Sequence, residues 1–561
     1  RIGSLPPGVE LAATRFLTRY NQVEDDEIAD EDLVRETSES RLLCRTLCDF
    51  FRLHAGAKDG LTLVVYRNED IQPVLAGIDA YVRFLEREIP PESRVERYSI
   101  RLTVFSESSD TSVVAQWLSA WQDYIESKDD VSGSYADCDF SVSHRLVGQG
   151  TEGVLQLAKT IRSDVDADVF VLYDFIRPDN QGCVFEKADP YVTTNNSIKF
   201  PILEQSQCAS TKPNERFRRS QIVSNRQFKV ADAHANLSAR VKDPGVHAGD
   251  RHIILATGDY TPWRDVVDAA HETAEWVVAV DPLVDRALVA QSDERNSVLK
   301  RELIGFGSGV GQHGESNYTI STQQYRLGEL KDRLRSAMRG VFPYGSPDRD
   351  ARIAQTLLDE AKELSGLSLV RAIGPGEYVR DFLAYGILHR IIPLDPTAHL
   401  CDRLFSIDAY RHWFDLAADD NRHPDLLWLR ADIVENKLHL RASLIECKMG
   451  KSQNMVGHLE KAKTQIENGL RVLRPLFAPS GGSVATPRPD QRYWHLQLHR
   501  MIASAAPSSE DKSSFLSAME NLADGKFEIE WDAGVYTFVT DETRGPALEQ
   551  IEILTVAPDK D

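Results

Sequence analysis

Five short apolar runs constrain the fold of this chain more than any other feature. They are LTLVVY (61–66), IRLTVFS (100–106), DVFVLYDF (168–175), HIILATG (252–258) and WVVAVDP (276–282). Continuous Val, Ile and Leu runs separated by helical stretches are typical of a parallel sheet covered by helices on both faces. The pattern predicts an α/β domain over residues 56–335, preceded by a helical segment at 1–55.

Two of these runs end in an acid, Asp174 and Asp281. Ligands of parallel sheets bind at the carboxyl ends of the strands, so either residue is a candidate for a nucleotide-sensing site. No G-x-x-x-x-G-K-[ST] motif occurs in the 561 residues to hold a triphosphate. A strand-end Asp that caps the next helix is the alternative.

Two polar stretches interrupt this pattern. Residues 186–250 are aperiodic and carry the basic residues Arg216, Arg218, Arg219, Arg226 and Lys229, which suit either a solvated loop or contacts with a phosphate backbone. Residues 305–322 contain five glycines that fit a dinucleotide fingerprint by spacing alone. A strand-like NYTIST follows these glycines, so we expect a turn between two β segments, or a loop closing over a partner.

Composition places the protein in the cytoplasm and away from membranes. No apolar run approaches the roughly 20 residues of a membrane span. The seven cysteines are odd in number and lack the spacing of a disulfide framework, which favours a reducing compartment. Cys44 and Cys48 are four residues apart, as on one buried helix face. The chain begins at Arg1, and we expect it to be part of a longer protein.

Residues 336–561 carry the strongest chemical pattern. A helix at 376–392 is followed by an apolar strand that opens at Pro424-Asp425, a polar turn at 435–437, and a strand that runs back to Glu446-Cys447-Lys448. Glu446 and Lys448 are two residues apart, so both side chains project from the same face of their strand. Asp425 on the neighbouring strand can lie beside Glu446.

This pairing predicts a metal site. Two carboxylates and a backbone carbonyl form an oxygen-rich site for Mg²⁺ or Mn²⁺, and Lys448 would orient a water or a phosphate. Asp432 is a second choice for the first acid, although it lies nearer the hairpin turn. An ordinary hairpin with a surface salt bridge between Glu446 and Lys448 is the alternative.

Pro424-Asp425, twenty intervening residues and Glu446-Cys447-Lys448 resemble the PD-(D/E)xK nuclease superfamily, whose core is a mixed sheet flanked by helices. The resemblance implies a phosphodiester hydrolase. It implies a role for Gln465, on the helix after the lysine, and a further metal ligand on an upstream helix. Glu377 is the candidate for that ligand, with Asp381 and Asp408 behind it.

The charge distribution is compatible with this resemblance. The whole chain carries a net charge of −21, which by itself argues against nucleic-acid binding. Residues 340–500, however, hold 21 Lys and Arg against 20 Asp and Glu, and residues 441–500 hold 10 against 4. The basic residues after Lys448 are therefore placed to meet a phosphate backbone.

The rest of this region is predicted in outline. A Pro-, Gly- and Ser-rich insertion at 478–492 is expected to be mobile. Helices at 493–504 and 511–523, a hairpin at 527–541 and a last strand, IEILTV, are expected to complete the domain.

A second resemblance covers more of the chain. The runs at 224–234, 276–286 and 304–322, together with the nuclease motif, look like the amino-terminal part of the large ATPase component of phosphorothioation-dependent DNA restriction systems. Those proteins continue into a HerA/FtsK-like translocase. The resemblance implies an Mg²⁺-dependent endonuclease of an anti-phage defence complex, with DNA and an ATPase as partners. A catalytically silent scaffold that binds DNA or a protein is the alternative.

Overall fold

The computed structural model describes residues 28–68, 70–89, 97–107, 111–129, 135, 137–176, 184–188, 202–209, 214–223, 251–285, 288–289, 301–311, 316–341, 346–364, 378–395, 398–414, 423–435, 437–479, 491–505, 518–519, 521–522 and 525–541. The chain forms two compact units. One comprises residues 1–47, 59–288 and 310–317, and the other residues 48–58, 289–309 and 318–561.

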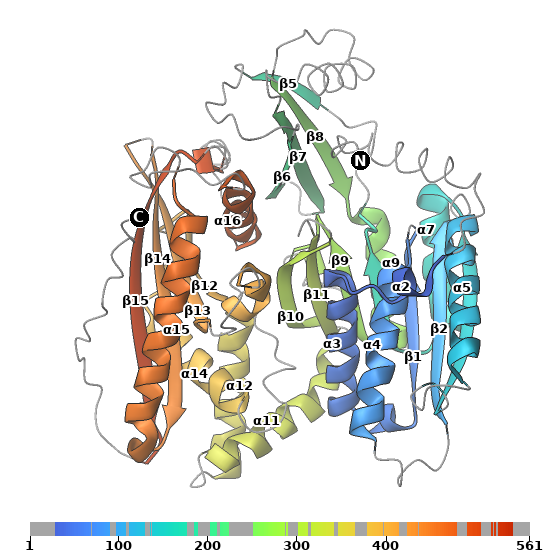
Figure 1. Ribbon diagram of the computed structural model, residues 1–561, viewed down its shortest axis with the longest axis horizontal. Coiled ribbons are helices and arrows are strands. Elements are labelled where there is room, and N and C mark those ends of the chain that lie inside the picture. Colours follow the sequence, from blue (N-terminus) through green and yellow to red (C-terminus); the bar gives the residue numbers. More distant parts are fainter. Residues whose placement is uncertain are drawn as a thin grey trace. The chain divides into compact units, whose positions relative to one another are not determined.

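Most strands of a largely parallel sheet come from the first unit (Figure 1). Its seven strands follow the order β10-β11-β9-β4-β1-β2-β3. They are β1 (Gly60–Tyr66), β2 (Tyr98–Glu107), β3 (Cys138–Val147), β4 (Ala167–Tyr173), β9 (Ala274–Asp281), β10 (Arg301–Val310) and β11 (Ser316–Gln323). The neighbours from β3 to β9 all pair in parallel. Strands β1, β4 and β9 are buried almost throughout, as in a sheet covered on both faces, so the predicted α/β class is confirmed.

Helices precede and connect these strands. They are α2 (Asp30–Leu33), α3 (Ser38–Leu53), η1 (Ala55–Lys58), α4 (Gln72–Glu88), α5 (Thr111–Asp129), α7 (Gly150–Asp164) and α9 (Thr261–Thr273). Helix α4 has Pro73 in its first turn, where the missing N–H has no intrahelical partner to lose. The predicted amino-terminal helical segment corresponds to α2 and α3 within the described residues. Cys48 is buried on α3.

One predicted strand belongs to a different sheet. HIILATG forms β8 (Arg251–Asp259), which is not part of the parallel sheet but of a four-stranded sheet of order β5-β8-β7-β6. Its other strands are β5 (Val184–Ala188), β6 (Ile202–Ala209) and β7 (Glu215–Val223), and all their pairings are antiparallel. The prediction was wrong because a short apolar run does not specify its partners or their direction.

The basic cluster of the polar stretch lies partly on β7, so this part is ordered strand rather than loop. Arg216 is buried, and its Nη2 donates to Asp285 Oδ1 at 3.1 Å, which gives it a structural role. The side chains of Arg218 and Arg219, as well as Arg226 and Lys229, lie outside the described part of the chain.

The glycine-rich stretch joins two strands, as expected. Gly309 at the end of β10 and Gly311 after it adopt φ values of 83° and 98°, which favour glycine. A Cβ at Gly307 would come within 2.5 Å of the Tyr318 ring, so this strand packs too closely for a side chain. The element after the glycines is strand β11, whereas a dinucleotide fingerprint requires a helix at that point, so the stretch does not fit such a fingerprint.

The second unit contains a four-stranded mixed sheet of order β12-β13-β14-β15. Its strands are β12 (Cys401–Ser406), β13 (Leu426–Val434), β14 (Lys437–Gly450) and β15 (Phe527–Val539). The first two pairings are antiparallel, and β14 pairs with β15 in parallel. The helical elements of the unit are η6 (Gln324–Arg326), α11 (Leu327–Val341), α12 (Pro347–Glu363), α14 (Tyr378–Ile391), η7 (Ile407–Trp413), η8 (Ser452–Asn454), α15 (Met455–Leu476) and α16 (Gln491–Ala505).

The apolar core of this unit fixes which way β14 faces. Leu438, Leu440, Ala442 and Leu444 alternate along the strand and pack in one cluster with residues of α15 and α16, among them Leu473 and Trp494. Because side chains alternate with a period of two, Glu446 and Lys448 continue the series that faces α15. The odd-numbered residues face the other way.

The predicted hairpin at 527–541 is wrong. Residues 527–539 form the single strand β15, which pairs with β14 over thirteen successive positions. The Ala533-Gly534 pair sits opposite Leu444 and Ile445 within that ladder, so the long parallel neighbour keeps the strand straight. Helix α16 was predicted, whereas most of the 478–492 insertion, the helix at 511–523 and the last strand lie largely or wholly outside the described residues.

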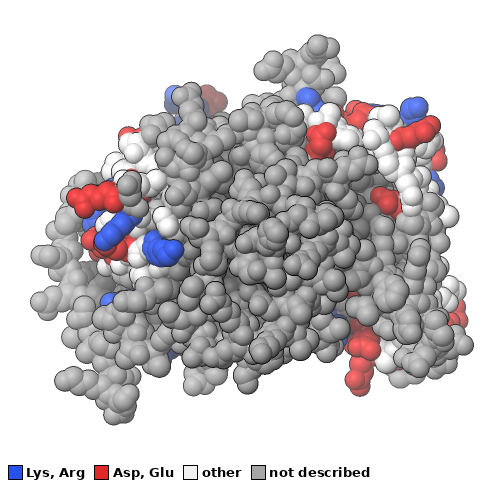
Figure 2. Space-filling model, turned by 90° about the horizontal axis from the view of Figure 1, so that it is seen from above, with Lys and Arg blue, Asp and Glu red and all other residues white. Residues whose placement is uncertain are grey.

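The described residues show mixed surface charge and no membrane span. On the face seen in Figure 2, Lys and Arg side chains lie beside Asp and Glu side chains at several places. None of the described helices combines the length and the apolarity needed to cross a bilayer.

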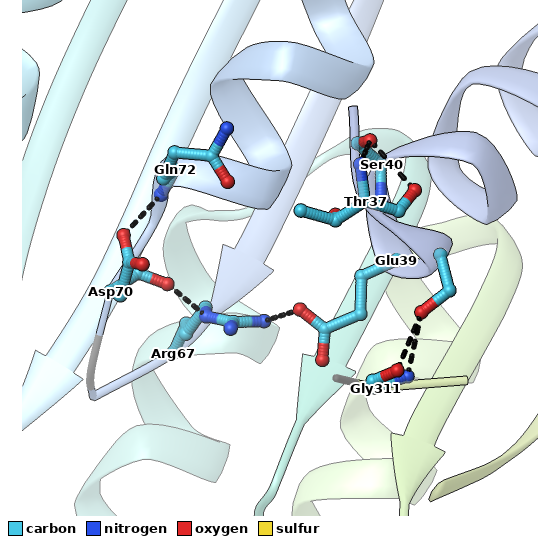
Figure 3. A network of polar contacts seen from close by, with 8 residues as sticks. Thr37, Glu39, Ser40, Arg67, Asp70, Gln72 and Gly311 are labelled. Carbon is cyan, nitrogen blue, oxygen red and sulfur yellow. Dashed lines mark hydrogen bonds and ion pairs between the residues drawn. The ribbon is translucent and has the colours of Figure 1, made fainter. Parts of the chain in front are cut away.

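A buried ion pair lies at the carboxyl edge of the parallel sheet. From β1 the chain proceeds to β2 and β3 on one side and returns to β4 on the other, so the strand order reverses between β1 and β4. Arg67 follows β1 at this point. Its Nη1 lies 3.0 Å from Glu39 Oε2 of α3, and its Nε donates to the Asp70 carbonyl (Figure 3). Its guanidinium lies 4.6 Å from the Tyr173 ring centre.

The same edge holds the start of α3. Ser38 Oγ and the backbone of Gly311 exchange hydrogen bonds of 2.9 Å, and Thr37 and Ser40 cap one another. Ligands of doubly wound sheets bind at such a reversal point. Here the guanidinium of Arg67 is already paired with a carboxylate of the same chain, that of Glu39.

Glu39→Gln should lower the free energy of unfolding by about 3 kcal/mol, because Arg67 would remain buried without its counter-charge. Glu36→Gln is the matched control, because Glu36 forms an exposed pair with Arg41, and it should change stability by less than about 1 kcal/mol. Urea denaturation measures both. The double variant Glu39→Leu/Arg67→Met should recover most of the stability lost in Glu39→Gln. Equal losses in Glu39→Gln and Glu36→Gln would contradict the assigned role of the buried pair.

Candidate active site

Strand pairing brings the two predicted acids together. Leu426, the first residue of β13, is paired with Ile445 of β14. Asp425 precedes Leu426, and Glu446 follows Ile445, so the two acids lie opposite each other in the antiparallel register. Lys448 lies two residues further along β14, on the same face as Glu446.

Asp425 and Glu446 are locked by two reciprocal hydrogen bonds. The N–H of Asp425 donates to Glu446 Oε2 at 3.1 Å, and the N–H of Cys447 donates to Asp425 Oδ2 at 2.8 Å. We call this pair of bonds the carboxylate clasp. Each carboxylate thus binds the backbone beside the other one, which holds both side chains in a single arrangement.

Helix α15 contributes the third element of the site. Lys448 Nζ donates to Glu446 and, at 3.0 Å, to Gln465 Oε1. Gln465 Nε2 donates to the carbonyl oxygen of His423 at 3.0 Å. Gln465 therefore binds both the lysine at the end of β14 and the segment that leads into β13.

Burial dominates the electrostatics of the acids. The Glu446 side chain is fully buried, and burial together with the charge of Asp425 raises the pKa of Glu446 to about 9. Burial likewise raises the pKa of Asp425. One lysine faces two carboxyl groups, so without a second cation Glu446 keeps its proton up to a pH near 9.

Lys448 stays an ammonium in this environment. Burial lowers the pKa of Lys448, but attraction by Glu446, and then by Asp425, more than offsets this, so that the pKa lies above its ordinary value. A lysine of this kind donates hydrogen bonds and stabilises negative charge. It does not accept a proton near neutral pH.

Helix α14 supplies two further groups. The buried Tyr385 hydroxyl lies within hydrogen-bonding reach of Asp425, and its pKa is raised well above the ordinary value by burial, then by Asp425 and Asp381. Asp381 lies one turn before Tyr385 and also acts electrostatically on Lys448. Glu377, the predicted third ligand, lies outside the described residues, so the described upstream acid near the site is Asp381.

The other predicted acids differ in their positions. Asp408 of η7 lies 3.7 Å from His423 Nε2 and acts electrostatically on Asp425, so it borders the site. Asp432 is paired with His439 near the hairpin turn and lies 2.6 Å from His399 Nδ1. It is seven residues from Asp425, roughly 20 Å along a strand. The structure places Asp425, not Asp432, beside Glu446.

The strand-end acids of the first unit differ from each other. Both oxygens of the buried Asp281 accept backbone N–H groups, from Ile176 and Leu283, each at 2.7 Å. Asp281 thus holds the turn after β9 and the segment after β4, which is a structural role, although not the helix cap given as the alternative. Asp174 is exposed with a φ of 44°, and its N–H donates to the Val280 carbonyl.

Sequence reasoning missed two residues that lie in the site, Tyr385 and His423. Tyr385 is four residues after Asp381, so helical periodicity places both on one face of α14. His423 immediately precedes Pro424-Asp425, and its Nδ1 donates to the Pro424 carbonyl at 3.1 Å. Tyr385 could have been found from its spacing to Asp381. His423 could not, because it joins the site through the hydrogen bond from Gln465 to its carbonyl oxygen.

The donor types suit a hard divalent cation. Asp425 and Glu446 offer carboxylate oxygens, and such an ion would take the place of the proton that Glu446 otherwise retains. In the described ranges, no group of three or more His, Cys, Asp or Glu side chains is arranged to hold a metal. The two clasped carboxylates fit a cation by charge and donor type, with further oxygens needed to complete its coordination.

No protein-family model matches this chain, and a search of curated proteins finds no match. What the site does is therefore inferred from its residues and their geometry.

Glu446→Gln should stabilise the metal-free protein increasingly as pH rises. The folded state binds the Glu446 proton more tightly than the unfolded state, so stability is fully present below the ordinary pKa of 4.5 and is lost as pH rises towards about 9. Glutamine does not ionise, so the variant does not lose this stability as the pH rises. In EDTA, the difference in unfolding free energy between variant and wild type should grow by more than about 1 kcal/mol from pH 5 to pH 8.

Glu460→Gln, at an exposed position of α15, serves as the control and should show a flat difference over the same pH range. A flat difference for Glu446→Gln as well would mean that this carboxyl is not held in a charge-excluding environment.

Proposed function

We propose that the second unit is a metal-dependent nuclease that hydrolyses phosphodiester bonds of DNA. The observation that carries the proposal is the placement of Lys448 between Glu446 and Gln465, directly beside the carboxylate clasp. Two acids, a lysine and a helix-borne glutamine thus meet at one end of a mixed sheet. This is the set of residues that the PD-(D/E)xK resemblance implies.

Each residue of the chain has a distinct task in this proposal. Lys448, as an ammonium, stabilises the negative charge that develops on the phosphate and orients the attacking water. Gln465 fixes the direction of the Lys448 side chain. Tyr385 and the N–H of Cys447 hold Asp425, so the carboxylate need not reorganise during the reaction.

Asp425 and Glu446 would hold Mg²⁺ or Mn²⁺, with Asp381 the nearest described acid on α14. A bound divalent cation would neutralise phosphate charge and lower the pKa of a water. Glu377 stays a prediction. Two carboxyl groups with raised pKa values beside a single lysine support this cofactor, because a divalent cation would stabilise both groups in the ionised form.

The catalytically silent alternative has one observation in its favour. Lys448 already satisfies Glu446, and the described residues do not assemble a three-donor metal site. A nuclease-like fold with such a site would bind DNA or a protein without cutting it. Cleavage of plasmid DNA separates the two functions.

The larger setting is also a proposal. The resemblance of three runs to phosphorothioation-dependent restriction proteins supports a role in cytoplasmic anti-phage defence, with a HerA/FtsK-like ATPase as partner. In such a system the ATPase would move DNA and the present chain would cut it.

The wild-type chain should nick supercoiled plasmid in Mg²⁺ or Mn²⁺, and EDTA should stop the reaction. Asp425→Asn and Lys448→Met should each reduce the cleavage rate roughly 100-fold or more, because each removes charge from the reacting centre while preserving side-chain volume. Asp432→Asn is the matched control, an acid-to-amide change on the same strand, and should retain the wild-type rate. Gel electrophoresis of the plasmid measures all four proteins.

Cleavage that survives in both Asp425→Asn and Lys448→Met would refute the assigned site. A wild-type chain that binds DNA but never nicks it in either metal would favour the silent alternative.

A further inference from the structure

One lysine of α15 lies next to the site without belonging to it. Lys461 is four residues before Gln465, so both side chains lie on the same helix face, about 6 Å apart along the axis. Gln465 reaches into the site, where it binds Lys448 and the His423 carbonyl. Lys461 is exposed one turn nearer the start of the helix.

Lys461 has no ion pair with any described residue. Its neighbours at helical spacing are Gly457, His458, Thr464 and Gln465, none of which is acidic. Three other basic residues in this region either interact with another residue or are less exposed. Arg471 Nη2 donates to Asn468 Oδ1 at 2.7 Å, Lys451 acts on Asp541, and Lys463 is half-buried.

Helix α15 approaches the end of β14 one turn before Lys461. His458 lies one turn before Lys461, and its Nε2 lies 3.4 Å from the position that a Cβ would take at Gly450, the last residue of β14. Lys448 is two residues before Gly450. A nucleic-acid strand whose scissile phosphate meets Lys448 would pass this part of α15.

We propose that Lys461 binds the DNA phosphate adjacent to the scissile one and so sets the path of the strand across α15. The inference rests on the proposed nuclease function. A lysine is suited to this contact because it presents a point charge to a phosphate without reading sequence. Glu460, the neighbouring acid, is about 100° away around the helix, on a different side.

The binding test uses the full chain in EDTA, which prevents cleavage, and a fluorescein-labelled DNA duplex whose anisotropy gives Kd at several KCl concentrations. Lys461→Gln should weaken binding roughly eightfold near 0.1 M salt and reduce the slope of log K against log salt by about 0.9, as loss of one phosphate contact predicts. Lys461→Arg should keep the wild-type slope. In Mg²⁺, Lys461→Gln should raise KM and leave kcat within about twofold.

Lys437→Gln is the control for the loss of one surface charge. Lys437 is exposed, and it starts the same strand β14, about 30 Å from Glu446. Its Kd and salt slope should match the wild type.

The possible outcomes separate this inference from the proposed function. A Lys461→Gln variant with unchanged Kd and slope, in a chain that still cleaves plasmid, would overturn the role of Lys461 alone. Equal losses in Lys461→Gln and Lys437→Gln would also overturn it, because they would reflect net charge rather than a contact. A wild-type chain that neither binds nor cleaves DNA would refute both proposals.

Discussion

The carboxylate clasp is the interaction on which the candidate site depends. Two carboxylates buried side by side repel each other and lose their hydration, and either would turn away if it were free to do so. The clasp prevents this, because the N–H of Asp425 binds Glu446 and the N–H of Cys447 binds Asp425. Both donors belong to a rigid antiparallel pair, so the fold of the sheet itself sets the separation of the acids. Lys448 and Gln465 then add to an arrangement that the backbone already holds.

The clasp also explains why the neighbouring helices present polar side chains at this end of the sheet. The even-numbered face of β14 is apolar up to Leu444 and becomes charged at Glu446, just where α15 offers Gln465 instead of another apolar residue. Helix α14 offers the Tyr385 hydroxyl to Asp425. Asp425 and Lys448 each have a partner on a neighbouring helix, and Glu446 is bound by the Asp425 N–H and by Lys448. A lone substitution in this set leaves a buried group without its partner, which costs more than the bond itself is worth.

Local patterns predicted much of this unit, and the reasons are physical. The β13–β14 hairpin, α14 and α15 follow from residue periodicity, and periodicity also places Glu446 and Lys448 on one strand face. The β15 prediction failed because a Gly within an apolar run resembles a turn, whereas thirteen pairings with β14 hold it straight. The strand at 252–258 was found, but its sheet was not, since pairing partners are not encoded in a single run. Tyr385 and His423 entered the site only through tertiary contacts.

Asp281 and Asp425 show why an acid beside a strand is not by itself evidence of chemistry. Asp281 lies at the end of an apolar strand and is buried, whereas Asp425 precedes an apolar strand and is half-buried. Asp281 gives each oxygen to a backbone N–H, so its charge is fully used in holding a turn. Asp425 accepts from the Cys447 N–H and lies within reach of the Tyr385 hydroxyl, and it also faces a second carboxyl group with one lysine beside them. A carboxyl group that shares its site with a second one and a lysine can act on a ligand, whereas one whose two oxygens are both bound to backbone N–H groups stabilises the fold. This difference, rather than the sequence motif, is the physical reason to place chemistry at Asp425.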